Sequence, residues 1–224
     1  MEEFTLIELK KIKIFHRKNL VIDKADLKVN KGEFVYLIGK TGSGKSSILK
    51  ALYKETDIAE GEGTIIDFDL VKIKKRQIPK LRKQLGIVFQ DFQLLPDRSV
   101  IENLLFVMKA TGWKDKKAMT DHAKLILEQV NLSGIENKHP HQLSGGQQQK
   151  VVIARAMINS PKIILADEPT GNLDPQSSQE IMNLLTTISK GGTAIVMATH
   201  DMDIVKQYPG RILKCENGIL TKLN

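Results

Sequence analysis

Three apolar runs stand out along the chain, and each is followed by a glycine-rich or polar segment. They cover Phe34–Ile38, Ile163–Ala166 and Thr193–Ala198. Short runs without polar alternation are typical of strands that are buried on both faces of a sheet. Such strands, separated by helical stretches, build a mostly parallel sheet with helices on both sides. The pattern therefore predicts an α/β fold.

Three other regions show different patterns. Residues Phe4–Val29 alternate between apolar and polar positions in short pieces, which predicts antiparallel strands. Between Ser99 and Gln129 the apolar residues, among them Ala123 and Leu127, recur at helical spacing and predict a helical insert. The sequence Glu216-Asn217-Gly218 predicts a hairpin turn between two short strands.

Composition narrows the class of protein. With 224 residues, 41% hydrophobic and 27% charged, the chain has the balance of one compact domain. Its single cysteine, Cys215, excludes an intrachain disulfide and a metal site made of several thiolates, which fits a reducing compartment. No apolar run approaches the roughly 20 residues that cross a bilayer, and Met1–Lys11 lacks the pattern of a secretory signal. We expect a cytoplasmic protein that serves a membrane process only by docking on a spanning partner.

The formal net charge is +8, and the densest basic run is Lys72–Lys83. Such an excess can direct a protein to nucleic acid or to anionic lipid. The simpler interpretation, which we favour at this point, is a solvated face. No aromatic residue interrupts the run, so it does not indicate a platform for stacking single-stranded bases.

A phosphate-binding loop follows the first apolar run. Residues Gly39–Ser46 read G-K-T-G-S-G-K-S and match the pattern G-x-x-x-x-G-K-[ST] between a predicted strand and the helical run Ser47–Leu52. Its glycines let several amide N–H groups converge on a phosphate, Lys45 reaches the β- and γ-phosphates, and the Ser46 hydroxyl ligates Mg²⁺. We expect ATP to contact Gly39, Lys40, Thr41, Gly42, Ser43, Gly44, Lys45, Ser46 and Ser47.

An acidic pair ends the second apolar run. Asp167 lies at the end of the strand Ile163–Ala166, and Glu168 follows it directly. Together with the phosphate loop, Asp167 is expected to hold Mg²⁺ beside Ser46, and Glu168 to polarise the attacking water. The pair predicts a nucleotide hydrolase without defining its kind.

A second anion site lies about 20 residues before Asp167. Leu143–Gln147 reads L-S-G-G-Q, and Ser144 can cap a helix over about Gly145–Asn159 whose free N–H groups attract a phosphate. One chain already has its own phosphate loop, so a second phosphate site implies another subunit. The segment resembles the signature of ABC ATPases. That resemblance implies a homodimer in which the opposite monomer's ATP is contacted by Ser144, Gly145, Gly146 and Gln147.

Four further positions match this family one by one. Gln90, after the predicted strand Gly86–Phe89, resembles the glutamine that senses Mg²⁺ and water. Asn172-Leu173-Asp174 resembles the loop that couples the two nucleotide sites, with Asp174 near ATP. His200 resembles the histidine that bonds the γ-phosphate and braces Glu168. Phe15 stands where the family usually stacks a tyrosine on adenine; it keeps the aromatic face and lacks the hydroxyl, and it could instead belong to the core.

The resemblance covers Phe4 to about Leu223 and implies an ABC-type nucleotide-binding domain. Such a domain has a RecA-like phosphate-loop core, an N-terminal antiparallel β subdomain and a helical insert. We therefore predict a single domain over residues 1–224, with the core at about 1–90 and 160–224 and the helical subdomain at about 91–159. The implied catalytic residues are Lys45, Gln90, Glu168 and His200, and the implied Mg²⁺ ligands are Ser46, Gln90 and Asp167.

The segment after Gln90, which reads D-F-Q-L-L-P-D-R-S-V up to Val100, most resembles the cell-division family FtsE. That family pairs with the membrane protein FtsX and controls peptidoglycan hydrolases from the inner face of the plasma membrane. The resemblance implies a membrane partner bound through Gln90–Val100 and the helical subdomain. An ATPase of a lipoprotein-release or macrolide-type exporter is the alternative. A soluble ABC ATPase of DNA repair or ribosomes, or a scaffold with incidental catalysis, fits less well, and we expect no nucleic-acid partner.

Overall fold

The parallel part of the sheet contains the predicted buried strands. The computed structural model describes residues 4–223; residues 1–3 and 224, the ends of the predicted domain, lie outside the described residues. The five strands lie in the spatial order β6, β7, β8, β3, β9, and all neighbours in this set pair in parallel. They span β6 Leu85–Val88, β7 Ile163–Asp167, β8 Ala194–Thr199, β3 Phe34–Ile38 and β9 Arg211–Glu216.

Alternate residues of these strands enter two different hydrophobic cores. In β8, Val196 and Ala198 pack in one core, whereas Ile195 and Met197 pack in the other. All six residues of β8 are buried, as are all five of β3. The absence of polar alternation in the sequence therefore reflects a sheet that is covered on both faces, and the α/β prediction is confirmed.

The N-terminal region forms the predicted antiparallel strands. β1 (Thr5–His16) pairs with both β2 (Asn19–Asn30) and β4 (Glu60–Ile65), and β4 pairs with β5 (Phe68–Asp69). The final hairpin joins β9 to β10 (Ile219–Leu223). Its two turn residues have positive φ angles, 51° at Asn217 and 76° at Gly218, as a tight hairpin turn requires. A parallel bridge between β10 and β2 joins the ten strands of the described part of the chain into one sheet.

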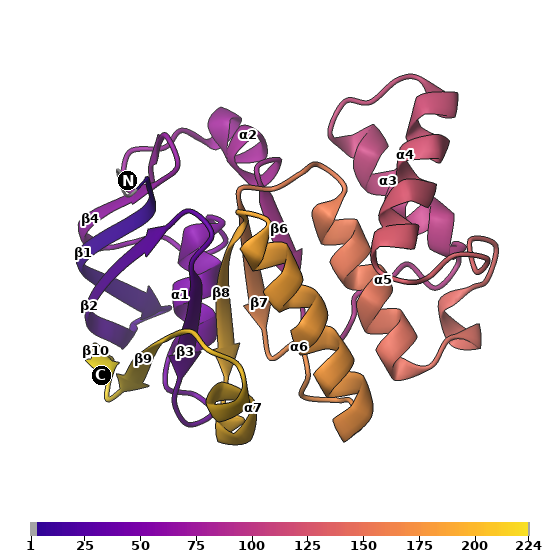
Figure 1. Ribbon diagram of the computed structural model, residues 1–224. Coiled ribbons are helices and arrows are strands. Elements are labelled where there is room, and N and C mark those ends of the chain that lie inside the picture. Colours follow the sequence, from indigo (N-terminus) through magenta and orange to yellow (C-terminus); the bar gives the residue numbers. More distant parts are fainter. Residues whose placement is uncertain (1–3, 224) are drawn as a thin grey trace.

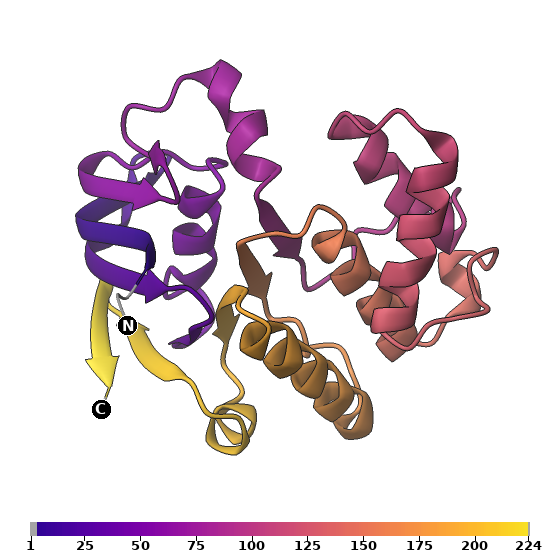
Figure 2. The ribbon, with the colours of Figure 1, turned by 45° about the horizontal axis from the view of Figure 1, so that its top comes forward.

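Helices cover both faces of the sheet (Figure 1). α1 packs in the core that contains Val196 and Ala198. α5 and α6 lie side by side over the other core, which contains Ile195 and Met197. The predicted helical insert forms α3 and α4, which join α5 in a helical group at one end of the molecule (Figure 2). The helices are α1 Lys45–Leu52, α2 Ile78–Arg82, α3 Val100–Ala110, α4 Lys116–Gln129, α5 Gly145–Met157, α6 Pro175–Lys190 and α7 Met202–Gln207, with short 3₁₀ turns η1 Lys75–Gln77 and η2 Pro140–Gln142.

The helix ends follow from local sequence. Ser99 caps α3 in a capping box, in which the Ser99 hydroxyl accepts from the Glu102 amide and the Glu102 carboxylate accepts from the Ser99 amide at 2.8 Å. Asp115 caps α4 by accepting from two backbone amides. Within residues 4–223, no helix combines the length and apolar character that a bilayer span needs.

Candidate active site

The predicted phosphate-loop lysine and catalytic glutamate meet at the carboxyl ends of β3 and β7. The Lys45 ammonium donates to the backbone carbonyls of Gly39 at 2.8 Å and Lys40 at 3.2 Å. It also lies 3.7 Å from Glu168 Oε1, and the lysine side chain is only 5% exposed. Since the parallel strands of one sheet end at the same edge, and only β8 lies between β3 and β7, the topology brings these distant residues together.

The loop backbone has the conformation that its glycines permit. Gly42 and Gly44 have φ angles of 79° and 104°, which strain any residue with a β-carbon. A β-carbon on Gly39 would collide with the backbone carbonyl of Cys215 in β9. α1 then begins at Lys45, so the loop ends at a helix N-terminus that favours anions. Lys40, Thr41 and Ser46 are exposed, while Ser43 and Ser47 are half-buried.

Asp167 has a buried carboxylate oxygen, Oδ1, without a hydrogen-bond partner among the described residues. The Ser46 hydroxyl lies near this carboxylate. Burial raises the pKa of the Asp167 carboxyl, and the nearby Ser46 hydroxyl offsets only part of this effect. A hydroxyl beside an unsatisfied carboxylate oxygen is a donor set that suits Mg²⁺, a hard cation that binds through few protein oxygens.

Glu168 and His200 form a close pair beside this carboxylate. His200 Nδ1 lies 2.6 Å from Glu168 Oε2, and the exposed fractions of the two side chains are 58% and 13%. Glu168 has a φ of 48°, an uncommon left-handed conformation for a residue with a β-carbon. Its amide donates to the Ala198 carbonyl of β8 at 2.9 Å. The backbone therefore turns sharply after β7 and places the glutamate between Lys45 and His200.

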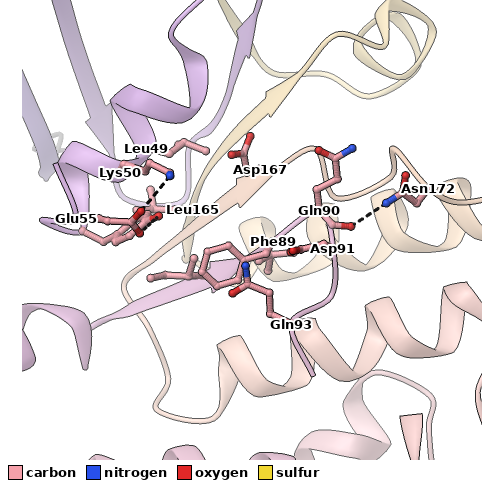
Figure 3. Close-up of a pocket in the computed structure, with 13 residues that line it drawn as sticks. Leu49, Lys50, Glu55, Phe89, Gln90, Asp91, Gln93, Leu165, Asp167 and Asn172 are labelled. Carbon is pink, nitrogen blue, oxygen red and sulfur yellow. Dashed lines mark hydrogen bonds and ion pairs between the residues drawn. The ribbon is translucent and has the colours of Figure 1, made fainter. Parts of the chain in front are cut away.

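A polar cavity separates Asp167 from the loop after β6 (Figure 3). Gln90 and Asn172 line it from one side, and the side-chain amide of Asn172 donates to the backbone carbonyl of Gln90 at 3.2 Å. On the other side Lys50 pairs with Glu55 at 3.0 Å. The predicted Mg²⁺ and water sensor therefore lies in the same cavity as the predicted Mg²⁺ ligand.

The signature segment forms a capped helix start, as the sequence predicts. The Ser144 hydroxyl accepts from the Gln147 amide at 3.2 Å, and the Ser144 amide donates to Gln147 Oε1 at 3.1 Å. Gly145 and Gly146 pack against Leu173 and Ser177, near the start of α6. Among the described residues, no hydrogen bond joins this segment to the phosphate loop of the same chain.

Two more predicted contacts, Asp174 and Phe15, do not line the cavity beside Asp167. Asp174 caps α6 by accepting from the Ser177 amide at 2.9 Å, and hydrogen bonds from the Ser177 side chain and amide lower the pKa of its carboxyl. Phe15 is 39% exposed, so the alternative that it belongs to the core is wrong. It pairs across the strands with Leu20, which lines the same hollow as the phosphate loop and His200.

Comparison with known proteins places this arrangement in a family. The ABC transporter family model matches residues 22–171, from within β2 to beyond the acidic pair. The chain belongs to the ABC transporter family. This ABC chain is 41% identical over 215 residues to the cell division ATP-binding protein FtsE of Streptococcus pneumoniae, covering 96% of the chain and 93% of that protein. It is 44% identical over 201 residues to FtsE of Mycobacterium tuberculosis, covering 90% and 87%.

A solved structure agrees with the fold of this ABC ATPase. The post-hydrolysis dimer of the ATP-binding cassette MJ0796, bound to ADP and Pi, matches with a TM-score of 0.85 and 32% identity, covering 98% of this chain and 99% of that one. The FtsE relatives place the chain in the FtsE branch of the family and favour it over the exporter alternative. The ABC ATPase fold and an ATP-hydrolysing activity follow from this membership.

Sequence reasoning missed several residues around this ABC site. Lys50 and Tyr53 line the cavity beside Asp167, and burial raises the pKa of the Tyr53 phenol. Arg155, on α5, donates to the backbone carbonyls of Phe92 and Gln93 and so fixes the loop after Gln90. Lys50 could have been recognised from the sequence, because it lies five residues after Lys45 in the predicted helical run. Arg155 carried none, because an arginine on a helix is usually exposed.

Proposed function

We propose that this chain is the ATPase subunit of a cell-division complex of the FtsE–FtsX type. It binds ATP in two copies and transmits the hydrolytic cycle through a membrane partner to peptidoglycan hydrolases. The observation that carries the proposal is the convergence of Lys45, Glu168 and His200 at one edge of the sheet. The identity to FtsE proteins over most of the chain supports the choice of branch.

In the proposed site, the amides of Gly39–Ser47 and the Lys45 ammonium bind the phosphates, and Phe15 stacks on adenine. The Lys45 ammonium already lies in the curve of its own loop, held by two carbonyls. Ser46, Asp167 and Gln90 would hold Mg²⁺. The metal would neutralise charge on the phosphate oxygens when bound.

Glu168 acts as the residue that orients and polarises the attacking water. His200 holds the glutamate through the 2.6 Å contact and bonds the γ-phosphate from its exposed edge. Lys45 stabilises the charge that develops on the transferred phosphoryl group. Lys45, Glu168 and His200 follow three different strands, β3, β7 and β8, so small movements between these strands would change the reaction rate.

Dimerisation completes the site in this proposal. Ser144, Gly145, Gly146 and Gln147 of one copy would bind the γ-phosphate held by the other copy, with Asp174 beside it. The N-terminus of α5 is capped but open, because Ser144 is exposed and Gly146 is half-buried. The dimeric ABC cassette at 32% identity supports this arrangement.

The proposed membrane partner docks in a groove between α2, the outer edge of β6 and α3. Leu95, Phe106 and Val107 line this groove, which we call the edge groove, and the Phe106 ring is 44% exposed. The Arg98 guanidinium lies 4.6 Å from the Phe106 ring centre. An exposed aromatic ring next to an arginine is a common anchor in protein interfaces. A partner seated there would hold the chain at the inner face of the plasma membrane and would touch the loop after Gln90.

The catalytic assignment is tested with Glu168→Gln. The amide keeps the size of the side chain and removes the carboxylate, so hydrolysis should fall by about 100-fold or more. The ATP-bound dimer should then accumulate in size-exclusion chromatography. Glu128→Gln, on the exposed side of α4, is the control and should behave as the wild type. Normal hydrolysis by Glu168→Gln would refute the assignment.

Docking is tested separately with Phe106→Asp in cells that produce the FtsX-like partner. The variant should lose co-purification with the partner while its ATPase activity in isolation persists. Leu125→Asp is a matched control, since Leu125 is 50% exposed on α4 and lies outside the edge groove. Equal loss of the partner in both variants would reject the edge groove as the docking site.

A further inference from the structure

The net positive charge of the chain is concentrated in one short segment. Residues 72–83 contain seven lysines and arginines and no acidic residue. When these seven are set aside from the 34 Lys and Arg, 27 remain against 26 Asp and Glu. The rest of the chain is therefore almost neutral, and nearly all of the +8 charge belongs to this one segment.

This segment is ordered and fixed to the core. Leu81 is fully buried, and Ile73 packs against the same core. Arg82 donates to the backbone carbonyls of Tyr53 at 2.9 Å and Lys54 at 3.1 Å. Lys83 donates to the Thr111 carbonyl at 2.9 Å. Two of the seven cations thus hold η1 and α2 in place, and the others are presented on a rigid support.

Four of the remaining five cations form no ion pair among the described residues. Lys72 lies 3.5 Å from Asp69, in an exposed pair that contributes little. Among the described residues, four cations of this segment are exposed and form no ion pair: Lys74, Lys75, Arg76 and Lys80. Lys74, Arg76 and Lys80 line a shallow hollow together with Gln77. Like charges held this close repel one another, so an anionic surface would relieve the repulsion.

The position of this basic segment indicates which kind of anion it binds. Pro79, Arg82 and Lys83 form one wall of the edge groove, opposite Phe106 and Val107. Both views place α2 at an outer edge of the molecule, before the start of β6 (Figure 1 and Figure 2). Val71, directly before the basic run, is an apolar side chain that is 44% exposed. A membrane protein seated in the edge groove would therefore have these cations along its flank.

We propose that Lys72, Lys74, Lys75, Arg76 and Lys80 form a basic surface that binds the headgroups of anionic lipids beside the membrane partner. Clusters of four to eight cations near a bilayer are the usual form of this recognition. Nucleic acid fits less well, because no aromatic side chain in residues 72–83 offers a stacking face. The position beside the bilayer rests on the proposed function, whereas the affinity for anionic lipid is a property of this chain alone.

The test uses the purified full chain and sedimentation with vesicles of phosphatidylcholine alone, or with phosphatidylglycerol replacing part of it. The wild type should bind the phosphatidylglycerol vesicles and not the neutral ones, and added salt should weaken the binding. The variant Lys74→Gln, Lys75→Gln, Arg76→Gln, Lys80→Gln should lose at least about tenfold in partitioning, since each cation near the surface contributes severalfold. Its ATPase activity should stay unchanged.

A matched variant removes the same charge elsewhere: Lys24→Gln, Lys162→Gln, Lys190→Gln and Lys222→Gln, all exposed positions. It should keep wild-type vesicle binding. The proposal is overturned if the wild type ignores phosphatidylglycerol, if both variants lose binding equally, or if a labelled DNA or RNA oligonucleotide binds more tightly than the vesicles at the same ionic strength. Loss of ATP hydrolysis in Glu168→Gln is measured apart, so failure of either proposal is recognisable.

Discussion

The side-chain amide of Asn172 donates a hydrogen bond to the backbone carbonyl of Gln90, across 3.2 Å and 82 residues of sequence. This bond joins the loop after β7 to the loop after β6, at the cavity that holds Asp167. The glutamine predicted to sense the metal is therefore positioned by the segment predicted to couple the two nucleotide sites. A change in the conformation of either loop would therefore shift the other.

Removal of this link is expected to slow hydrolysis without unfolding the protein. Asn172→Ala leaves the loop after β6 less well positioned, and kcat should fall roughly two- to tenfold, a rise of about 0.5–1.5 kcal/mol in the activation barrier. The unfolding temperature should hardly move. Steady-state ATPase assays and thermal unfolding measure both effects, with Asn183→Ala on the exposed side of α6 as the control. A fall in stability as large as the fall in rate would argue against a positioning role.

Asp167→Asn is expected to stabilise the nucleotide-free protein while it abolishes hydrolysis. Burial raises the pKa of the Asp167 carboxyl, so the charged form destabilises the fold at neutral pH. The neutral amide removes this cost, and each 1 kcal/mol gained raises the unfolding temperature by about 2–4 °C. The advantage should shrink as the pH falls through the raised pKa and vanish below about 4, the ordinary value. The unfolding temperatures of the variant and the wild type across this pH range test the prediction. A variant less stable than the wild type at pH 7 would contradict it.

Gly146→Ala is expected to destabilise the start of α5. A β-carbon there would come within 2.7 Å of Ser177 Oγ and 3.0 Å of Ser177 Cβ, so the helices must shift, at a cost of about 1–3 kcal/mol. Gly145→Ala meets only the tip of Leu173 at 3.3 Å and should cost less. Adding Ser177→Gly to Gly146→Ala should restore part of the unfolding temperature. Without such rescue, the contact with Ser177 is not the cause.

Phe15→Ala is expected to weaken ATP binding with little effect on stability. Loss of base stacking costs roughly 1–3 kcal/mol, or about fivefold or more in Kd. Phe15→Tyr keeps the ring and should bind ATP as the wild type does. Phe4→Ala is the control, because Phe4 is also exposed, at 63%. Titration with a fluorescent ATP analogue measures the affinities; equal binding by Phe15→Ala would remove Phe15 from the site.

Much of the core could be predicted because its signals are local. The strand Phe34–Ile38 was predicted with its observed bounds. A fully buried strand contains no polar residue, so its two ends are easy to locate in the sequence. The glycines of the phosphate loop carry their own backbone requirement. The sequence also placed Ser144 at a helix cap, because the capping box repeats a short pattern.

The rest depends on contacts between distant segments. β4 was not predicted as a separate strand, because Gly61 and Gly63 lower its strand propensity and only pairing with β1 holds it. β10 and β2 pair at one position, Ile219 with Lys24. Neither segment carries a sequence pattern that predicts this pairing.

The place of β3 in the sheet has a consequence for how the protein is made. The strand that carries the phosphate loop lies between β8 and β9, and within residues 4–223 it pairs with no strand that precedes residue 194. During synthesis on the ribosome, residues 34–38 must therefore wait for segments translated much later. We expect a nascent chain to gain affinity for ATP only after Arg211–Glu216 has emerged, so that incomplete copies cannot compete for nucleotide.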